Sequence, residues 1–388
     1  MPDKLFGDSK AAVIAIKTKK RVPSQSDKVR FGSGAISVLV DQWFAENTFH
    51  ADEFSDLAKL AALKKQRGET VSLALPTLNE EKTLGKILDI VCNKLRDEHG
   101  LIDEIVVIDS NSTDSTREIA KSFDIPVYIH QEILPEQGAR PGKGEALWKS
   151  LYVTSGDILL WVDTDISNFH ERFVYGLLGP LLQQKNLMLA KGFYKRPLKT
   201  GSRLESGRGG RVTELTARPL FNLFYPELSG IIQPLSGEYG GRRSALEQLK
   251  FTSGYGVETS VLIETFTKFS LNSMAQVDMI ERIHNNQSLT NLSKMSFAIT
   301  QTVLSRLGER YGQHLFDDVN RSLKIVKTEG ENYHLDVEEI AELERPPMIE
   351  VPEYRLKRGL DEQFNQSSKI VNFSKANGPT TSYPTRTN

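Results

Sequence analysis

The sequence predicts an α/β fold in which a mostly parallel sheet is flanked by helices. Short, continuously apolar runs, such as 105–108 and 158–162, have the length of buried strands. Segments with helical spacing of apolar residues separate these runs, and polar residues follow the runs directly. Continuously apolar strands that alternate with helices are typical of a parallel sheet covered on both faces.

The expected elements of this region follow one another in a regular order. A helix is expected first, at 52–67, because the apolar residues there approximate helical spacing. After it come a strand at 71–76, a helix at 84–91, a strand at 103–110, a helix at 112–123 and strands at 125–130 and 156–165. This alternation predicts strand-helix units of the kind that build a parallel sheet.

The second half of the chain has a different character. Segment 191–218 holds eight Lys or Arg residues and five glycines, a composition that is typical of loops. Two later segments, 257–269 and 292–307, are expected to be helices, and the second is amphipathic. The C-terminal region is therefore expected to consist of helices and loops.

Length and composition bound the class of protein. The 388 residues are 39% hydrophobic and carry a net charge of -1, so the chain can bury a core but has no overall field that attracts nucleic acid or anionic lipid. The apolar runs are strand-sized, far below the roughly 20 residues that cross a bilayer. The single cysteine, Cys92, cannot form an internal disulfide, and the start of the chain is polar and basic. We therefore expect a cytoplasmic protein.

Polar side chains follow three of the expected strands. Ligands of open parallel sheets bind beyond the carboxyl ends of the strands. After the first two strands, Asn79 and Ser112 are also good helix N-caps, and capping is the simpler interpretation of both. Asp163 and Asp165, directly after a buried strand, need a compensating cation. A divalent metal that bridges the diphosphate of a nucleotide sugar meets this need.

Two further segments carry possible binding groups. Lys143 lies between two glycines at the expected start of a helix, where backbone amides and an ammonium can meet phosphate. The segment is not a Walker loop, because Gln137 and Gly144 occupy positions that the motif reserves for glycine and a hydroxyl residue. An ordinary glycine turn explains it equally well. His284 has Arg282 and two asparagines as close neighbours in the sequence, although a hydrated loop is the simpler interpretation.

Eight motifs occur in one order between about Trp43 and Met348. They are PTLNEE, IDSNSTD, PGKGEAL, VDTD, GRVTELTARPL, QPLSGEY, GYGVE and RIHNN. Together they closely resemble the motifs of the glucosyl-3-phosphoglycerate synthases, which are retaining glycosyltransferases with a Rossmann-like GT-A fold. The first 40 residues and the C-terminal tail lie outside this resemblance.

The resemblance implies a role for each residue that matches a family motif. The donor contacts fall on Pro76, Thr77, Leu78, Glu80, Ser110, Lys143, Asp163, Thr164, Leu235 and Tyr255. The acceptor contacts fall on Gly210, Arg211, Thr213 and Asn286, and the metal ligands on Asp165 and His284. Catalysis is assigned to Asp165, Glu258 and Lys143. Thr77 and Thr164 stand where the family often has small residues, and neither change removes a charge.

The implied reaction transfers glucose to the 2-hydroxyl of 3-phosphoglycerate with retention of configuration. UDP-glucose is the favoured donor, a divalent metal (Mg2+ or Mn2+) is the cofactor, and the product leads to the compatible solute glucosylglycerate. A mannosyl-3-phosphoglycerate synthase that uses GDP-mannose remains an alternative. So does a protein of another class, a non-catalytic regulator that binds a phosphorylated metabolite.

These roles divide the chain into five expected regions. A loosely ordered arm (1–40) precedes a nucleotide-sugar-binding region (41–190), a region that binds the acceptor and completes the metal site (191–290), a C-terminal extension (291–360) and a disordered tail (361–388). The extension has apolar positions beyond those that a nucleotide-binding sheet requires, so we expect it to form a homodimer. Nucleic acid and membrane partners are not expected, because few aromatic residues accompany the basic segment and the apolar runs are short.

Overall fold

The structure is a computed structural model. It describes residues 33–196, 198–200, 203–205, 210–283, 287–312, 320–329, 332–340 and 342–360. The predicted tail at 361–388 and most of the predicted arm lie outside these residues. The end of the arm does not, and it differs from the prediction: helix α1 (Ser33–Asn47) begins inside the arm. Trp43 and Asn47 of α1 both donate hydrogen bonds to the carbonyl oxygen of Met274, which anchors this helix to the sheet.

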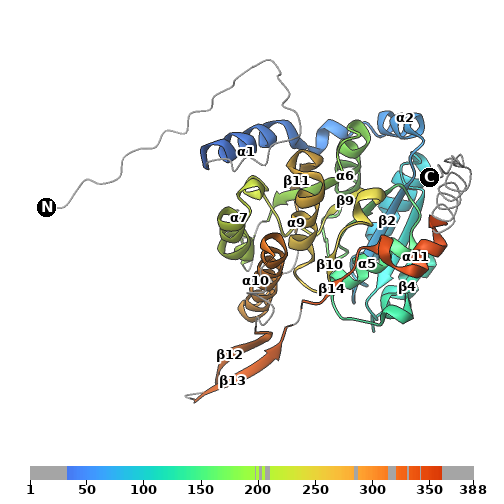
Figure 1. Ribbon diagram of the computed structural model, residues 1–388. Coiled ribbons are helices and arrows are strands. Elements are labelled where there is room, and N and C mark those ends of the chain that lie inside the picture. The colour runs from blue at the N-terminus through green and yellow to red at the C-terminus, as the bar shows by residue number, and fades with distance from the viewer. Residues whose placement is uncertain are drawn as a thin grey trace, which may run out of the picture.

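The described residues contain an eight-stranded sheet, and the α/β prediction is confirmed (Figure 1). Its order is β1 (Thr48–His50), β11 (Met274–Glu281), β6 (Leu189–Lys195), β9 (Tyr239–Arg242), β5 (Ile158–Trp161), β2 (Val71–Thr77), β3 (Glu104–Asp109) and β4 (Val127–Ile129). Strand β9 pairs antiparallel with β5 and β6, whereas the other neighbours pair parallel. Because β9 reverses direction between β5 and β6, the carboxyl ends of seven strands meet at one edge.

Helices cover both faces of this sheet. One face packs against α2 (Leu57–Arg67), α3 (Leu84–Ile90), α4 (Thr116–Ser122) and α6 (Arg172–Gln183). The other packs against α1, α5 (Lys143–Val153), α7 (Arg218–Phe224), α8 (Arg243–Leu246), α9 (Val257–Phe269), α10 (Leu289–Tyr311) and α11 (Pro352–Lys357). Neighbouring residues of one strand enter opposite cores: Leu73 packs in the first and Ala74 in the second. This two-sided burial explains why the strands read as continuous apolar runs.

Most expected elements are present, with shifted ends. The expected helix at 257–269 has these bounds in the structure, and the one at 292–307 extends to Leu289–Tyr311. The helix expected at 112–123 begins only at Thr116, because the residues before it form a loop that turns back toward the strand before it. Within the described residues, no helix combines the length and apolar character needed to cross a bilayer.

The boundary expected at residue 190 does not separate two folding units. Strands β9 and β11 belong to the region 191–290, yet they pair with β5, β6 and β1 in the same sheet. The sequence gives little sign of β9, since Tyr-Gly-Gly-Arg lacks the β-branched residues of a typical strand. Its glycines have a packing reason, because a Cβ at Gly240 would meet Leu160 at 2.6 Å and Leu159 as closely.

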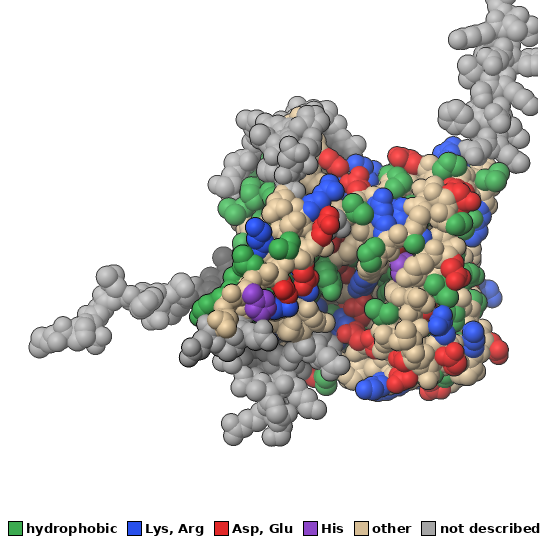
Figure 2. Space-filling model, turned by 90° about the horizontal axis from the view of Figure 1, so that it is seen from below, with side chains coloured by type: hydrophobic (Ala, Val, Ile, Leu, Met, Phe, Trp, Pro, Cys, Tyr) green, Lys and Arg blue, Asp and Glu red, His purple; other side chains and the backbone are tan. Residues whose placement is uncertain are grey.

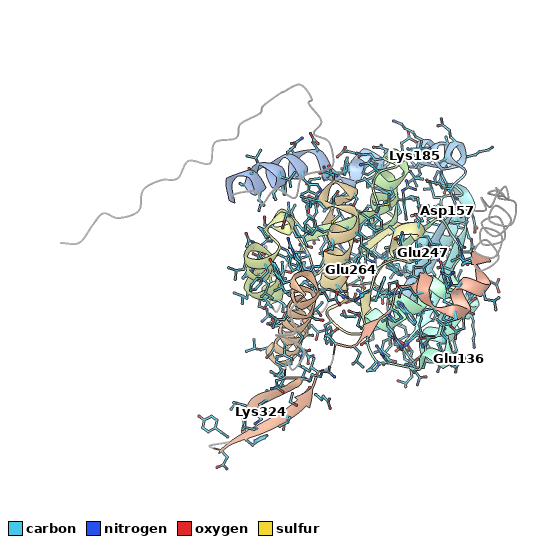
Figure 3. All side chains as sticks on the ribbon, viewed as in Figure 1. Glu136, Asp157, Lys185, Glu247, Glu264 and Lys324 are labelled. Carbon is cyan, nitrogen blue, oxygen red and sulfur yellow. The ribbon has the colours of Figure 1, made fainter. Side chains whose placement is uncertain are left out.

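The C-terminal extension contains strands that the sequence analysis did not predict. β12 (Ser322–Glu329) and β13 (Asn332–Glu339) form an antiparallel hairpin that projects from the body beside the end of α10 (Figure 1). Lys324 marks the hairpin in Figure 3. The described residues also form two short antiparallel strand pairs. These are β7 (Leu198–Thr200) with β8 (Arg203–Glu205), and β10 (Phe251–Thr252) with β14 (Glu344–Arg345). Through β14, the extension returns to the body of the protein.

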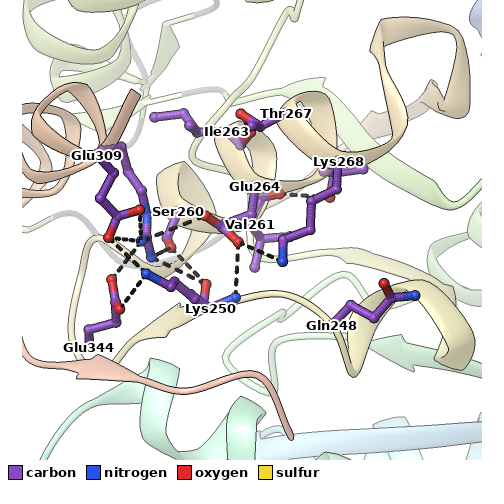
Figure 4. A network of polar contacts seen from close by, with 12 residues as sticks. Gln248, Lys250, Ser260, Val261, Ile263, Glu264, Thr267, Lys268, Glu309 and Glu344 are labelled. Carbon is purple, nitrogen blue, oxygen red and sulfur yellow. Dashed lines mark hydrogen bonds and ion pairs between the residues drawn. The ribbon is translucent and has the colours of Figure 1, made fainter. Parts of the chain in front are cut away.

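Buried ion pairs hold the extension against the body. Arg306 of α10 contacts Glu264 of α9 at 3.6 Å and Glu344 of β14 at 2.5 Å, within the network drawn in Figure 4. The next residue, Arg345, makes two hydrogen bonds of 2.8 and 2.6 Å to the Glu145 carboxylate of α5. The Arg345 guanidinium also lies 4.9 Å from the ring centre of Trp148. The extension is therefore fixed to α5 and α9, and its own helix α10 is tied to β14.

We predict that Arg345→Ala lowers the free energy of unfolding by about 3–5 kcal/mol, because it leaves the fully buried Glu145 carboxylate without its main partner. Urea unfolding of both proteins measures the difference. The matched control is Arg321→Ala at an exposed position, which should leave stability close to that of the wild type. A loss below about 1 kcal/mol in Arg345→Ala would show that the ion pair is not essential to the fold.

Candidate active site

The carboxyl edge of the sheet gathers the polar residues that follow its strands. Thr77 ends β2, Ser110 follows β3, and Asp163 follows β5. Arg196 and Arg282 follow β6 and β11 in the same way. Seen from below, the molecule is hollowed near its middle, with acidic and basic side chains in the hollow (Figure 2). The strand ends therefore supply the polar groups of this edge, as the sequence pattern indicated for β5 and as the resemblance implied for β2 and β3.

Two adjoining cavities open at this edge and share Lys143, Asp163, Gly254 and Tyr255. We call the first the β2-side cavity; it has about 1000 Å³ of empty space, including the part open to solvent. Its other lining residues are Pro76, Thr77, Leu78, Ser110, His130, Gln131, Pro141 and Gly142. The second, the α10-side cavity, has about 1140 Å³ by the same measure. It is lined by Asp165, Arg196, Gly210, Arg211, Val212, Thr213, Leu235, Gly237, Glu258, Arg282, Gln287, Leu292, Met295 and Ile299.

A network of ion pairs lies where the two cavities meet. The Lys143 ammonium lies 2.6 Å from Asp163 Oδ1 and 3.0 Å from Glu258 Oε1. On the other side of Asp163, Arg282 contacts Oδ2 at 3.0 Å, Glu238 at 2.7 Å and also Asp165. Burial alone would raise the pKa of Asp163, but the charges of Lys143 and Arg282 hold that pKa well below its usual range. Asp163 is therefore ionised throughout the physiological pH range.

Local backbone structure brings these groups together. Gly142, with φ of 111°, immediately precedes α5, so Lys143 is the first residue of that helix. A Cβ at Gly144 would overlap the carbonyl oxygen of Thr252, and the Glu145 amide donates a hydrogen bond to the Ser253 carbonyl at 3.0 Å. The start of α5 thus packs directly against the loop after β10. This close approach requires glycine, which explains the PGKG sequence without a Walker loop.

The loop at 254–256 is held by a carboxylate from the C-terminal extension. Glu342 accepts a hydrogen bond from the Gly254 amide at 3.1 Å and further hydrogen bonds from the amides of Tyr255 and Gly256. A Cβ at Gly254 would overlap this carboxylate, so a larger residue there would displace the Glu342 side chain from its present position. The loop presents Tyr255 to both cavities and leads into α9, which carries Glu258. Glu342 was not among the predicted site residues, yet it positions two of them, Tyr255 and Glu258.

Most residues predicted for the site line one of the two cavities. Pro76, Thr77, Leu78 and Ser110 line the β2-side cavity, and Lys143, Asp163 and Tyr255 line both. Asp165, Gly210, Arg211, Thr213, Leu235 and Glu258 line the α10-side cavity. Their assignment to donor, acceptor and metal stays a prediction. His284 and Asn286 lie outside the described residues.

Two predicted donor residues line neither cavity. Thr164 is buried, and its hydroxyl donates a hydrogen bond to the carbonyl oxygen of Pro76 at 2.9 Å. It therefore fixes the end of β2 against β5. The Glu80 carboxylate accepts a hydrogen bond from Thr83, and burial raises its pKa. Both residues support the loops of the β2-side cavity in this structure.

The capping interpretation of Asn79 and Ser112 is wrong. The backbone N–H of Asn79 donates a hydrogen bond to the Ser112 hydroxyl at 2.9 Å. The side-chain oxygen of Asn79 accepts one from the backbone N–H of Thr113 at 2.8 Å. Helices α3 and α4 begin later, after Thr83 and Ser115. The two residues instead tie together the loops after β2 and β3, which border the β2-side cavity.

Sequence analysis also missed several charged residues of this edge. Glu238 and Arg196 were not singled out, and Lys191 was counted in the basic loop although it is buried in β6. The Lys191 ammonium donates a hydrogen bond to the Ser236 carbonyl at 2.8 Å and lies 4.4 Å from the ring centre of Tyr239. One signal was present in the sequence: two carboxylates after a buried strand require cations, and Arg282 supplies one of them.

The residues present fit a divalent metal whose coordination is completed by a ligand. Asp165 lies at the mouth of the α10-side cavity with 40% of its side chain exposed, and Arg282 pairs with one of its oxygens. The described part of the chain contains no cluster of three His, Cys, Asp or Glu side chains that could hold a metal unaided. Hard divalent cations accept phosphate oxygens and waters as their remaining ligands. Asp165 is suited to that partial role.

Comparisons with known proteins agree with this geometry. Residues 72–249 match the family model described as Glycosyl transferase family 2. The chain is 50% identical over 327 residues to the glucosyl-3-phosphoglycerate synthase of Petrotoga mobilis, a match that covers 84% of this chain and 98% of that protein. The resemblance found in the motifs therefore extends over most of both chains.

Solved structures are similar as well. The mannosyl-3-phosphoglycerate synthase of Rubrobacter xylanophilus is 37% identical with a TM-score of 0.73, over 80% of this chain and 97% of that one. The glucosyl-3-phosphoglycerate synthase of Mycobacterium tuberculosis, in complex with Mn2+, UDP and phosphoglyceric acid, is 42% identical with a TM-score of 0.66, over 75% and 94%. Other crystals of the latter enzyme contain Mn2+ with UDP-glucose, or Mg2+ with UDP.

We predict that the stability cost of burying Lys191 depends on pH. Burial lowers the pKa of Lys191 to about 7, whereas an unfolded lysine titrates near 10.4. Between these values the unfolded chain binds one more proton, so the free energy of unfolding should rise with pH by up to about 1.4 kcal/mol per pH unit. Lys191→Met removes this contribution.

Urea unfolding of the wild type and of Lys191→Met tests this prediction. The measurements are made at pH of about 6.5, 7.5 and 8.5, which brackets a pKa near 7. The wild type should gain stability relative to the variant as pH rises. Lys185→Met, at an exposed position labelled in Figure 3, is the matched control and should show no such trend. A difference that stays constant with pH would mean that Lys191 keeps its proton throughout.

Proposed function

This chain belongs to the glucosyl-3-phosphoglycerate synthase family, and from that premise we propose that it transfers glucose from UDP-glucose to 3-phosphoglycerate. It is a glycosyltransferase that uses a divalent metal, Mn2+ or Mg2+. The observation that best supports this reaction is the meeting of two cavities at Lys143 and Asp163. One cavity has the predicted nucleotide contacts and the other has the predicted acceptor contacts.

The two cavities suit two separate substrates. UDP would occupy the β2-side cavity, with its diphosphate directed toward Lys143. 3-Phosphoglycerate would occupy the α10-side cavity, with its phosphate near Gly210, Arg211 and Thr213. Binding both substrates across one junction places the reacting carbon and hydroxyl near each other, which lowers the barrier through proximity and orientation.

The residues at the junction would act through charge and position. A bound divalent metal, held by Asp165 and by His284 as the resemblance implies, adds positive charge that stabilises the diphosphate leaving group. Lys143 would donate to a phosphate oxygen of the same group. The 2-hydroxyl would approach on the face that the diphosphate leaves and give its proton to the departing phosphate oxygen. Configuration at the sugar carbon is then retained.

Glu258 is placed to orient a substrate. Its carboxylate lies 3.0 Å from the Lys143 ammonium, and that ion pair lowers its strength as a nucleophile. A covalent sugar-enzyme intermediate on Glu258 would require this pair to separate first. We therefore assign Glu258 to positioning the sugar or acceptor hydroxyl.

The alternatives are less consistent with the relatives. The mannosyl-3-phosphoglycerate synthase structure is 37% identical, whereas the glucosyl-3-phosphoglycerate synthase of Petrotoga mobilis is 50% identical. The Mycobacterium tuberculosis glucosyl enzyme, 41% identical, is in complex with UDP-glucose in one crystal. A non-catalytic regulator would have no need for a nucleotide cavity beside the acceptor cavity. Both substrates are charged phosphate esters that do not cross membranes unaided, so we place the reaction in the cytoplasm.

We further propose that the C-terminal extension forms a homodimer through its hairpin. Val326, Tyr333, Leu335 and Val337 lie on one face of β12 and β13, and each is at least 60% exposed. Val326 and Leu335 are direct cross-strand partners. An apolar face on a projecting hairpin is costly in water, and a second copy of the same hairpin would cover it symmetrically.

The reaction itself is tested with purified protein, Mn2+, 3-phosphoglycerate and either UDP-glucose or GDP-mannose. We predict glucosyl-3-phosphoglycerate and UDP as products, with an α-anomeric NMR signal that matches the donor.

Asp165→Asn should lose at least about a hundredfold in kcat, because the leaving group is then less well stabilised. It should also bind Mn2+ more weakly in the presence of UDP, as measured by electron paramagnetic resonance.

A faster reaction with GDP-mannose would assign the chain to the mannosyl enzymes instead. Full activity of Asp165→Asn in EDTA would contradict the metal assignment. The control for folding is the circular dichroism spectrum and thermal midpoint of the variant, because Asp165 also pairs with Arg282.

Light scattering tests the dimer. We predict that the wild type has twice the mass of one chain at micromolar concentration, and that Leu335→Lys shifts it toward a monomer by placing a charge in the apolar face. His334→Lys lies on the opposite face of the same strand and is the matched control. A monomeric wild type, or equal dissociation in both variants, would rule out this interface.

A further inference from the structure

Four cationic side chains line the α10-side cavity: Lys143, Arg196, Arg211 and Arg282. Two of them are neutralised within the protein. Lys143 pairs with Asp163 and Glu258, and Arg282 pairs with Asp163, Asp165 and Glu238. Arg196 and Arg211 have no carboxylate partner among the described residues. Within the described part of the chain, Arg196 and Arg211 are therefore the two cations of this cavity whose guanidinium groups are not held in a direct ion pair.

Arg196 is held in place by neutral contacts. It immediately follows β6, so it lies at the carboxyl edge of the sheet beside Arg282. Its Nη2 donates a hydrogen bond to the Tyr194 hydroxyl at 3.0 Å, and its guanidinium lies 5.1 Å from the ring centre of Tyr194. Its Nε is buried and has no hydrogen-bond partner in the described residues. These contacts restrict the side chain and leave its charge available.

Tyr194 is itself fixed, which makes it a firm support for Arg196. Its hydroxyl also accepts a hydrogen bond from Arg282 at 2.9 Å, and its ring packs edge-on against Phe173. Burial raises the pKa of Tyr194 to about 12, so the hydroxyl stays neutral and adds no compensating negative charge. The support for Arg196 is thus rigid and uncharged.

The proposed acceptor has two anionic groups. In 3-phosphoglycerate, a carboxylate and a phosphate lie on opposite sides of the carbon that bears the reacting hydroxyl. The segment Gly210–Thr213, with Arg211, is already assigned to the phosphate by the resemblance. We propose that Arg196 binds the carboxylate, so that the two arginines hold the acceptor at both ends. This inference depends on the proposed function.

The chemistry of arginine suits this role. A guanidinium presents parallel N–H groups that match the two oxygens of a carboxylate, and it keeps its charge at every physiological pH. Attachment at both ends fixes the 2-hydroxyl between them, which is the orientation that transfer to this hydroxyl requires. Arg196 would therefore help to determine which acceptors are used.

Acceptors that lack one anion test this assignment. Glycerol 3-phosphate retains the phosphate and the central hydroxyl without the carboxylate, and glycerate retains the carboxylate without the phosphate. The test compares kcat/KM for these two acceptors and for 3-phosphoglycerate. It uses the wild type, Arg196→Gln and Arg211→Gln. A charge-assisted hydrogen bond corresponds to a loss of about tenfold to a hundredfold.

Arg196→Gln should lower the ratio of kcat/KM for 3-phosphoglycerate over glycerol 3-phosphate by that factor. Arg211→Gln should lower the ratio for 3-phosphoglycerate over glycerate instead, and it is the matched control. Arg196→Lys should restore part of the loss, since an ammonium keeps the charge without the paired N–H groups. The effect should be in KM for the acceptor, and KM for UDP-glucose should change little.

Other outcomes contradict the inference. Equal losses on 3-phosphoglycerate and glycerol 3-phosphate would show that Arg196 only supports the fold or binds the phosphate. If Arg196→Gln fails to fold, an Arg196→Lys variant with wild-type selectivity at every acceptor would overturn the assignment equally. A wild type without transfer to 3-phosphoglycerate would refute the proposed function, a failure distinct from that of Arg196.

Discussion

The active-site edge depends on one electrostatic constraint, which is that the Asp163 carboxylate lies between two cations. Lys143 comes from the start of α5 and Arg282 from the end of β11, so three elements far apart in the sequence meet at one carboxylate. Charges withdrawn from water in this way are stable only when their partners are well placed. Gly237 is part of the same constraint, because a Cβ there would overlap the Asp163 carboxylate. The positions of β5, β11 and α5 are thereby fixed relative to one another.

The C-terminal extension completes this edge. Arg345 pairs with Glu145 in the first turn of α5, and Glu342 binds the loop that carries Tyr255 and leads to Glu258. Both contacts involve segments that also carry residues lining the cavities. A segment that follows the α/β region in sequence therefore helps to shape both cavities, and its hairpin extends from the same connection. In the sequence, only a short stretch of chain separates β13 of the hairpin from Glu342, which holds this loop.

The sequence predicts the parts of the fold whose character is local. β2, β3 and β5 are apolar runs with polar ends, and α9 has clear helical spacing, so these elements could be predicted from local sequence. The site roles of residues such as Ser110 and Glu258 came from the resemblance to the family and stay predictions. β9 could not, because its glycines are set by close contact with β5 and β6. The link between Asn79 and Ser112 also depends on two loops meeting in space. Likewise, the sequence shows that Asp163 needs a cation, but only the fold shows that Lys143 and Arg282 share that role.

A crystal structure of the protein with Mn2+, 3-phosphoglycerate and a non-hydrolysable UDP-glucose analogue tests the central claim most directly. The account predicts the uridine in the β2-side cavity, the phosphoglycerate in the α10-side cavity and the diphosphate at their junction, within hydrogen-bond distance of Lys143. Asp163 should remain paired with Arg282. Both ligands in one cavity, or a diphosphate remote from Lys143 with the Asp163 pairs broken, would contradict it.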